Sequence, residues 1–494
     1  MPPRHTEYLT ILRYVIDPSL PEQDDGSSLD MPLVPRSNTY SYQPSNYLSL
    51  PTVLASMFNS AFLTAFFTLS FNIGNTGLLL SIFGMFLALV TITLSSIWIL
   101  ESTARLNGFH TAQMMSSPQT ESMNKLSHFP FQIAELFKQF VGPFSGVLAM
   151  IVVVFKNLMI VYRTYNQMID FIESVSSLFD WNVSTVQYFT LIITSVLMML
   201  LNVIQPTKIV RLQVIFSIIR FIFLAMCIVL SIYSISVQGA YPLSGQSFSD
   251  PKFYFSTSGF LSLFSQAALS LHASDSLTYA LHLLKPKQKL KANWHVFNVT
   301  LFSAIIFIIA GLLLALAMDH PSIPSLPLNF LMFTSKGFTY RNFENDNHPP
   351  WYAWFFALFT SLVQVLNAIT TTPFTVTTSA LNIIPFLPQQ VSSNISLTIK
   401  ILGIILVILP TPLIIWDVNS EILEYITDIS THLILLVLPA IAQLASKRKS
   451  QSEWKTPYSG VWSRDIFPFL SIAIGTVLTI ATAMSIVERL VFKI

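Results

Sequence analysis

Residues 296–318 read VFNVTLFSAIIFIIAGLLLALAM, a run without a single charged side chain. A helix needs about 20 mainly apolar residues to cross the hydrocarbon core of a bilayer. In hydrocarbon every backbone polar group must be satisfied internally, and a helix does this within its own segment. The stretch therefore predicts a membrane-spanning helix.

The composition extends this prediction to the whole chain. Of its 494 residues, 52% are hydrophobic and only 10% are charged, whereas a soluble chain carries about a quarter charged residues. Eleven spans would use about 220 mainly apolar residues and leave little for a globular domain. A large soluble catalytic domain is excluded, and so is a collagen-like or mostly disordered chain.

Several classes of chemistry are excluded by the reactive side chains. The single cysteine, Cys227, cannot supply a disulfide framework, an iron–sulfur cluster or a thiolate zinc site. The nine histidines show no metal-ligand spacing. No dinucleotide-binding, phosphate-loop or nucleophile-elbow motif occurs, and no basic–aromatic tract suggests nucleic acid. We expect no catalytic residues, no metal site, no cofactor other than a coupling Na⁺ or H⁺, and no nucleic-acid partner.

Eleven apolar runs divide the chain. Between the first two, the turn-type cluster 72–77 is expected to end the first span, and 102–142 reads as a polar connection that is partly helical along the membrane. Residues 1–50 read as a mostly disordered tail and 489–494 as a short tail, on either side of a transmembrane domain at 51–488. The predicted spans are 51–71, 78–101, 144–172, 187–205, 210–236, 256–281, 296–318, 351–381, 396–416, 427–446 and 466–488.

The basic residues set the orientation. Eleven spans place the two termini on opposite sides, and the lysine-rich segments 285–291 and 447–455 then share the side of the N-terminus. The positive-inside rule makes that side cytoplasmic. The sequon at 182–184 falls on the outer side, where glycosylation can occur. Plasma membrane and vacuolar or lysosomal membrane fit equally well. The N-terminal tail either binds a cytoplasmic partner or is simply solvated.

The sixth span contains a polar cluster over about four turns. Such a cluster suits a broken helix that lines a cavity, or else tight contacts between helices. His272 and Asp275 stand three residues apart, but nothing nearby supplies a nucleophile, so a membrane-embedded hydrolase is not expected. The cluster comprises Ser262, Ser265, Gln266, Ser270, His272, Ser274, Asp275 and Ser276.

Three other spans carry features of interest. The eighth holds a threonine-rich stretch, 370–378, around Pro373, whose missing N–H frees the carbonyl of Ile369. That carbonyl and the hydroxyls could coordinate a hard cation, or the threonines could merely stabilise a kink.

The third span places Lys156, Arg163 and Asp170 seven residues apart, near one helix face. The two basic residues either face water or acidic partners, or snorkel to the interface. Arg220, about ten residues into the fifth span, lies too deep to snorkel easily.

Short motifs in four spans resemble the amino acid/auxin permease family, particularly its sodium-coupled neutral amino-acid transporter branch. The first span keeps that family's asparagine as Asn59 and its leucine as Leu69, and continues into Asn75-Thr76-Gly77. The sixth keeps the histidine and tyrosine of the family's C-H-P-x-x-x-P-I-Y stretch as His272 and Tyr279. Thr372-Pro373 matches a T-x-P element, and Leu438-Pro439-Ala440 matches the tenth-span signature.

The resemblance implies an all-α polytopic membrane protein with a leucine-transporter-like fold of two inverted five-helix repeats plus an eleventh helix. The substrate then sits near the midplane, between broken first and sixth spans. Asn59, Thr371 and Thr372 become candidates for a cation site, with Arg220 as a charge-compensating group and Lys156, Arg163 and Asp275 as polar groups of the pathway. The implied substrate-lining residues are Leu63, Thr64, Ala65, Phe66, Thr68, Ala268, Leu269, Ser270 and His272.

Two departures from the family pattern modify these expectations. The three glycines of the family's first span correspond to Leu63, Ala65 and Thr68, and these side chains do not let the backbone approach a ligand as glycine does. Arg220 stands where the family has a small polar residue, and its positive charge discourages sodium. Arginine does not release a proton, so proton coupling would use another group, such as His272 or Asp275.

The sequence thus predicts a secondary transporter of amino acids or similar small zwitterions that works by alternating access, with weak or absent sodium coupling. The alternative is a transporter-fold protein that moves little substrate and acts as a nutrient sensor or scaffold through its N-terminal tail. A further alternative is an unrelated transporter fold. A broken first span opposite a broken sixth span, with a polar pocket, favours transport, whereas an unbroken first span packed with Phe66 and Phe67 and no central cavity favours the sensor.

Overall fold

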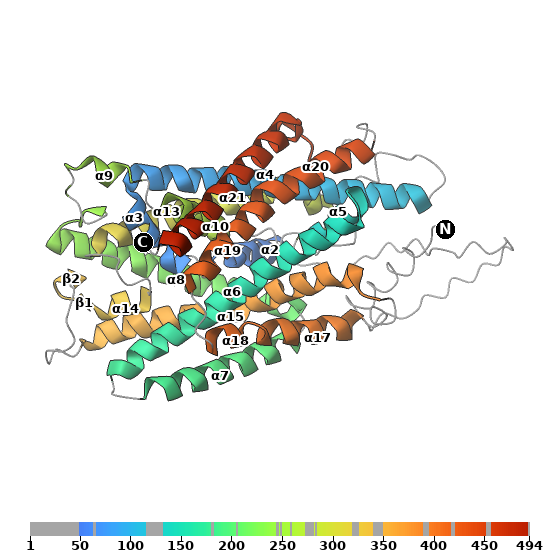
Figure 1. Ribbon diagram of the computed structural model, residues 1–494. Coiled ribbons are helices and arrows are strands. Elements are labelled where there is room, and N and C mark those ends of the chain that lie inside the picture. Colours follow the sequence, from blue (N-terminus) through green and yellow to red (C-terminus); the bar gives the residue numbers. More distant parts are fainter. Residues whose placement is uncertain are drawn as a thin grey trace.

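Helices make up most of the chain, and many of them lie side by side along one common direction (Figure 1). The computed structural model describes residues 49–62, 66–114, 132–178, 182–203, 206–243, 247, 249–256, 259–271, 281, 284–318, 326–338, 349–388, 395–415, 420–450 and 456–492. Residues 1–48 of the expected N-terminal tail and 493–494 of the expected C-terminal tail lie outside the described residues, as do His272, Asp275 and Tyr279. The tail expected at 489–494 is helical as far as Phe492, because α21 continues to that residue.

The elements follow one another as helices, with one short hairpin. They are α2 (Leu50–Ala61), α3 (Phe66–Thr76), α4 (Leu78–Met114), α5 (Ile133–Phe140), α6 (Pro143–Leu178), α7 (Val183–Val203), α8 (Pro206–Gln238), α9 (Pro251–Tyr254), α10 (Phe260–Leu271), α12 (Pro286–Lys289), α13 (Ala292–Ala317), α14 (Leu326–Leu331), β1 (Phe333–Thr334), β2 (Gly337–Phe338), α15 (Trp351–Ile383), η2 (Ile384–Phe386), α17 (Ile395–Ile408), α18 (Thr411–Ile415), α19 (Ser420–His432), the π-helix η3 (Leu433–Val437), α20 (Leu438–Lys449), η4 (Val461–Ser463) and α21 (Ile466–Phe492).

Within the described ranges, nine helices are long and apolar enough to cross a membrane. The other two predicted spans, the first and the sixth, correspond to α2 with α3 and to α10. α2 and α3 have 12 and 11 residues, so each is at most about 18 Å long, too short to cross a core of about 30 Å alone. Residues 272–280, which follow α10, lie outside the described ranges. The expected all-α polytopic membrane class is confirmed, and the five-plus-five inverted repeat stays a prediction.

Two expected boundaries near the N-terminal end are wrong. The cluster 72–77 does not end the first span, because α3 continues through it to Thr76, and only Gly77 leaves the helix, with φ at 89°. A side chain there would adopt a strained left-handed conformation and approach the carbonyl oxygen of Lys252 at 3.0 Å. The second span is also longer than expected, since α4 runs on to Met114 into the segment expected to be a polar connection.

Large apolar side chains project outward from the peripheral helices. Phe189 and Ile192 on α7 are 65% and 61% exposed, and Val477 and Met484 on α21 are 65% and 66% exposed. A soluble protein rarely leaves such apolar surface uncovered. These faces therefore belong against lipid, as the predicted bilayer partner requires.

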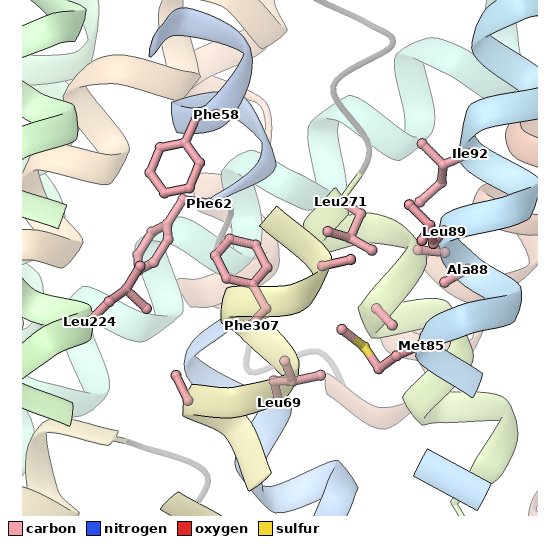
Figure 2. Packing of buried hydrophobic residues seen from close by; sticks show 14 of the residues in the cluster. Phe58, Phe62, Leu69, Met85, Ala88, Leu89, Ile92, Leu224, Leu271 and Phe307 are labelled. Atoms are coloured by element: carbon pink, nitrogen blue, oxygen red, sulfur yellow. The ribbon is translucent and has the colours of Figure 1, made fainter. Parts of the chain in front are cut away.

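The interior packs tightly around the end of α2. Phe58 of α2 and Phe62, the residue just after it, lie beside Phe307 of α13 and Leu224 of α8 (Figure 2). The rings of Phe62 and Phe307 meet edge to face, with their centroids 5.5 Å apart, a favoured geometry for aromatic pairs. This apolar packing fixes the end of α2 against α8 and α13, and so positions the polar groups described next.

Candidate functional site

The first span is interrupted at its centre. α2 ends at Ala61, and Phe62 has a non-helical backbone, with φ at −80° and ψ at 58°. Four residues later α3 begins at Phe66. A helix end leaves carbonyl or N–H groups without intrahelical partners, and such backbone is tolerated at membrane depth only where protein or a water-lined cavity surrounds it. The interruption therefore marks a candidate binding region.

Asn59, one turn before the interruption, holds α2 to α8. Its Nδ2 donates to the backbone carbonyl of Gln213 at 2.8 Å and to the Gln213 side chain, while its Oδ1 accepts from the Ser217 hydroxyl at 3.0 Å. All three side chains are buried. The amide predicted as a cation ligand is thus already engaged in hydrogen bonds between two helices.

Arg220 connects α8 to α15 at the same region. Its side chain is 0% exposed, and its Nη2 donates to Asn367 Oδ1 at 3.1 Å and to Thr370 Oγ1 at 2.6 Å. Its Cζ lies 5.6 Å from the centroid of the Phe62 ring, which gives the cation a favourable aromatic face. Nε and Nη1 have no hydrogen-bond acceptor in the part of the chain that is described.

A second polar group joins α6, α10 and α19. Arg163 Nη1 on α6 donates to Gln266 Oε1 on α10 at 3.1 Å, and the Arg163 Nη2 atom is buried without an acceptor among the described residues. The neighbouring Ser265 shares a hydrogen bond of 2.9 Å with Nε2 of His432, whose Nδ1 is likewise buried without a partner in the described ranges. His432 is followed directly by the π-helix η3, a local distortion that occurs frequently at functional sites.

The predicted site residues are placed as follows. On α15, Thr371 and Thr372 are buried, and the Thr371 hydroxyl donates to the carbonyl of Asn367 at 2.7 Å. Lys156 is buried on α6, and Ala268 and Leu269 are buried on α10. Phe66 and Thr68 lie in the first turn of α3, and Ser270 lies in the last turn of α10. Leu63, Thr64, Ala65, His272 and Asp275 lie outside the described residues.

Several partners in this region were not singled out from the sequence. Gln213 accepts from Asn59 of α2, Asn367 and Thr370 accept from Arg220 of α8, and His432 shares a hydrogen bond with Ser265 of α10. Each is a polar residue inside an apolar run, which is the one signal the sequence carries for them. Only the packing of the helices shows which of these polar residues meet.

No protein-family model matches the chain, and no curated protein sequence matches it. The comparisons therefore give no support to the amino acid/auxin permease family in particular.

Solved structures of a membrane transporter do resemble it. The manganese transporter of Eremococcus coleocola in complex with an aromatic bis-isothiourea substituted compound matches with a TM-score of 0.56 and 13% identity, over 95% of this chain and 92% of that one. A glutamate-to-alanine mutant of the same transporter matches with a TM-score of 0.55 and 14% identity over the same shares. At this identity the similarity is one of fold. The chain is a polytopic membrane protein with the fold of a membrane transporter.

Proposed function

We propose that this protein is a secondary active transporter of amino acids or similar small zwitterions, which works by alternating access without sodium coupling. The fold of a membrane transporter and the interruption between α2 and α3 support transport. In transporters built on broken helices, substrate and ions bind at the interruption, near the midplane. The end of α2 at Ala61 agrees with one part of the pattern expected for transport, a broken first span, and not with the unbroken helix expected for a sensor.

The observation that carries the proposal is the position of Arg220. Its guanidinium uses the oxygens of Asn367 and Thr370, which lie on the helix expected to supply cation ligands. A sodium ion about 4 Å from this charge would be repelled by about 4 kcal/mol at an effective dielectric constant of about 20. A divalent metal would be repelled about twice as strongly. Sodium coupling and transport of a bare metal ion are therefore both disfavoured.

The same charge suits a carboxylate. Nε and Nη1 of Arg220 are buried without an acceptor among the described residues, and a carboxylate is the usual partner of a buried guanidinium. The first turn of α3 begins beside the same interruption, and a helix N-terminus carries partial positive charge. Two independent features thus favour the carboxylate end of a small zwitterion.

Uptake into proteoliposomes tests the proposal. With a proton gradient imposed as the driving force, we expect a mixed pool of radiolabelled amino acids to accumulate equally with and without a sodium gradient, and uptake to fall at least about tenfold in Arg220→Met. Ser231→Ala is the matched control, because it removes another buried polar group of α8 whose hydroxyl has no partner in the described ranges. Sodium-driven uptake would refute the role given to Arg220. Absence of any amino-acid uptake by folded protein would refute transport of these substrates and favour the sensor.

A further inference from the structure

Arg163 and Arg220 lie at one depth in the membrane. Asn157 Nδ2 of α6 donates to Ser379 Oγ of α15 at 2.9 Å. Lys138 Nζ of α5, the helix just before α6, donates to the carbonyl of Pro385 in η2, the turn just after α15, at 2.6 Å. The start of α6 thus lies near the end of α15, and the two helices run antiparallel (Figure 1). Six residues beyond Asn157, about 9 Å along the axis, Arg163 is level with residues near 373 of α15. Thr370, which accepts from Arg220, is within about one turn of that level.

Each of these arginines lies beside one of the two spans predicted to be broken, the first and the sixth. Arg220 lies over the ring of Phe62, the residue at which α2 loses helical geometry. Arg163 is held by Gln266, which lies in the last two turns of α10 before its end at Leu271. α2 and α10 pack against each other, so the two guanidinium groups flank the same region from α8 and from α6.

Neither arginine has a carboxylate partner within the described part of the chain. Their hydrogen-bond acceptors there are the neutral side chains of Gln266, Asn367 and Thr370. Three of their nitrogens, Arg220 Nε and Nη1 and Arg163 Nη2, are buried without any acceptor among these residues. Charges inside a membrane protein normally pair with an opposite charge or face a water-filled path, and a buried donor left unsatisfied is costly.

We propose that the transported substrate carries two carboxylates, one bound by Arg220 and the other by Arg163, so that the protein prefers an acidic amino acid to its neutral amide. This inference rests on the proposed transport function. A site built for two carboxylates rejects an analogue that lacks one, because a buried guanidinium is then left without a partner. Arg163 is accordingly the residue that distinguishes substrates, whereas Arg220 is needed for all of them.

Two substrates of nearly equal shape, one with two carboxylates and one with a single carboxylate, test this inference. Uptake of labelled L-glutamate and L-glutamine is measured in proteoliposomes containing the full-length protein or its variants. We expect the wild type to take up glutamate at least about tenfold more efficiently than glutamine. Arg163→Met should reduce that preference to within about threefold by lowering glutamate uptake, and Arg163→Lys should retain part of it because the charge remains.

The control is Thr164→Val, which removes a neighbouring hydroxyl bonded only along its own helix, to the carbonyl of Ile160, and should leave the preference unchanged. Wild-type protein that transports glutamine as well as glutamate would overturn the two-carboxylate inference while leaving amino-acid transport intact. Absence of uptake for every amino acid would instead overturn the proposed function. If Arg163→Met does not fold, the glutamate-to-glutamine ratios of the wild type and Arg163→Lys decide the question.

Discussion

Replacing Glu101 by alanine should lower the free energy of unfolding far more than replacing Asp465, the acidic residue of an exposed ion pair. Glu101 is 0% exposed on α4. Its Oε1 accepts from Arg105 Nη2 at 3.4 Å and from the Ser463 hydroxyl at 2.9 Å, and its Oε2 accepts from Gln443 Nε2. One carboxylate thus joins α4, α20 and the segment leading into α21.

The magnitude follows from what the substitution leaves behind. Arg105 is 4% exposed and keeps only the neutral acceptors Gln443 Oε1, at 2.9 Å, and Ser446 Oγ, at 3.0 Å. Removing one member of a buried ion pair costs about 3–5 kcal/mol, because the remaining charge is buried without compensation. The Lys447–Asp465 pair is the contrast, since its atoms are 2.6 Å apart but Asp465 is 63% exposed. An exposed pair contributes only about 0–1 kcal/mol.

Unfolding of the purified protein in mixed micelles, titrated with a denaturing detergent, measures both free energies. Glu101→Ala should lower the free energy of unfolding by about 3–5 kcal/mol, and Asp465→Asn by less than about 1 kcal/mol. The double variant Glu101→Ala/Arg105→Met should lose less than the sum of the two single variants, by about 0.5–3 kcal/mol, because the charges are removed together. Equal losses for Glu101→Ala and Asp465→Asn would refute the reasoning from burial.

Three further outcomes are expected. Burial lowers the pKa of Lys289 from 10.5 to about 8, so between pH 8 and 10.5 the unfolded chain binds more protons at this residue than the folded one. The free energy of unfolding should therefore rise with pH across that window by up to about 3 kcal/mol, and Lys289→Met should remove the rise. In Gly475→Ala the new Cβ would lie 2.7 Å from Cβ of Leu436, whereas a Cβ at Gly460 would meet nothing within 4 Å. In the same unfolding assay, Gly475→Ala should lower the free energy of unfolding by about 1–3 kcal/mol, and Gly460→Ala should leave it almost unchanged. Similar losses at both positions would contradict this packing argument. Asn182 is exposed at the start of α7, so expression in glycosylating cells should add a glycan that Asn182→Gln removes, and an unmodified Asn182 would count against the outer position of this loop.

The sequence was sufficient to locate most of the membrane-spanning segments, because transfer of a segment into lipid depends on its own summed apolarity rather than on its neighbours. The prediction at 351–381 lies within two residues of α15, even though Pro373 falls inside that helix. The break in the first span is a different matter. No glycine or proline stands at residues 60–66, so the resemblance to a family, and not local propensity, was the source of that expectation.

The polar contacts between helices could not be predicted from the sequence. Arg220 was recognised as too deep to snorkel, since its distance from the ends of an apolar run can be counted. Its partners Asn367 and Thr370 lie well over a hundred residues away, and no local pattern links them. Asn59 was singled out as a cation ligand, yet the packing of α2 on α8 commits its amide to Gln213 and Ser217.

The sequence alone thus determined that the chain is a polytopic membrane protein and that Arg220 lies deep within a span, and it predicted which side of the membrane holds the basic segments. Hydrophobicity and helical periodicity are local properties, and they can be read along the chain. Only the tertiary structure decided that Arg163 and Arg220 share one depth, one beside the end of α2 and the other beside α10. That juxtaposition depends on how antiparallel helices pack side by side, and packing depends on residues that are far apart in sequence.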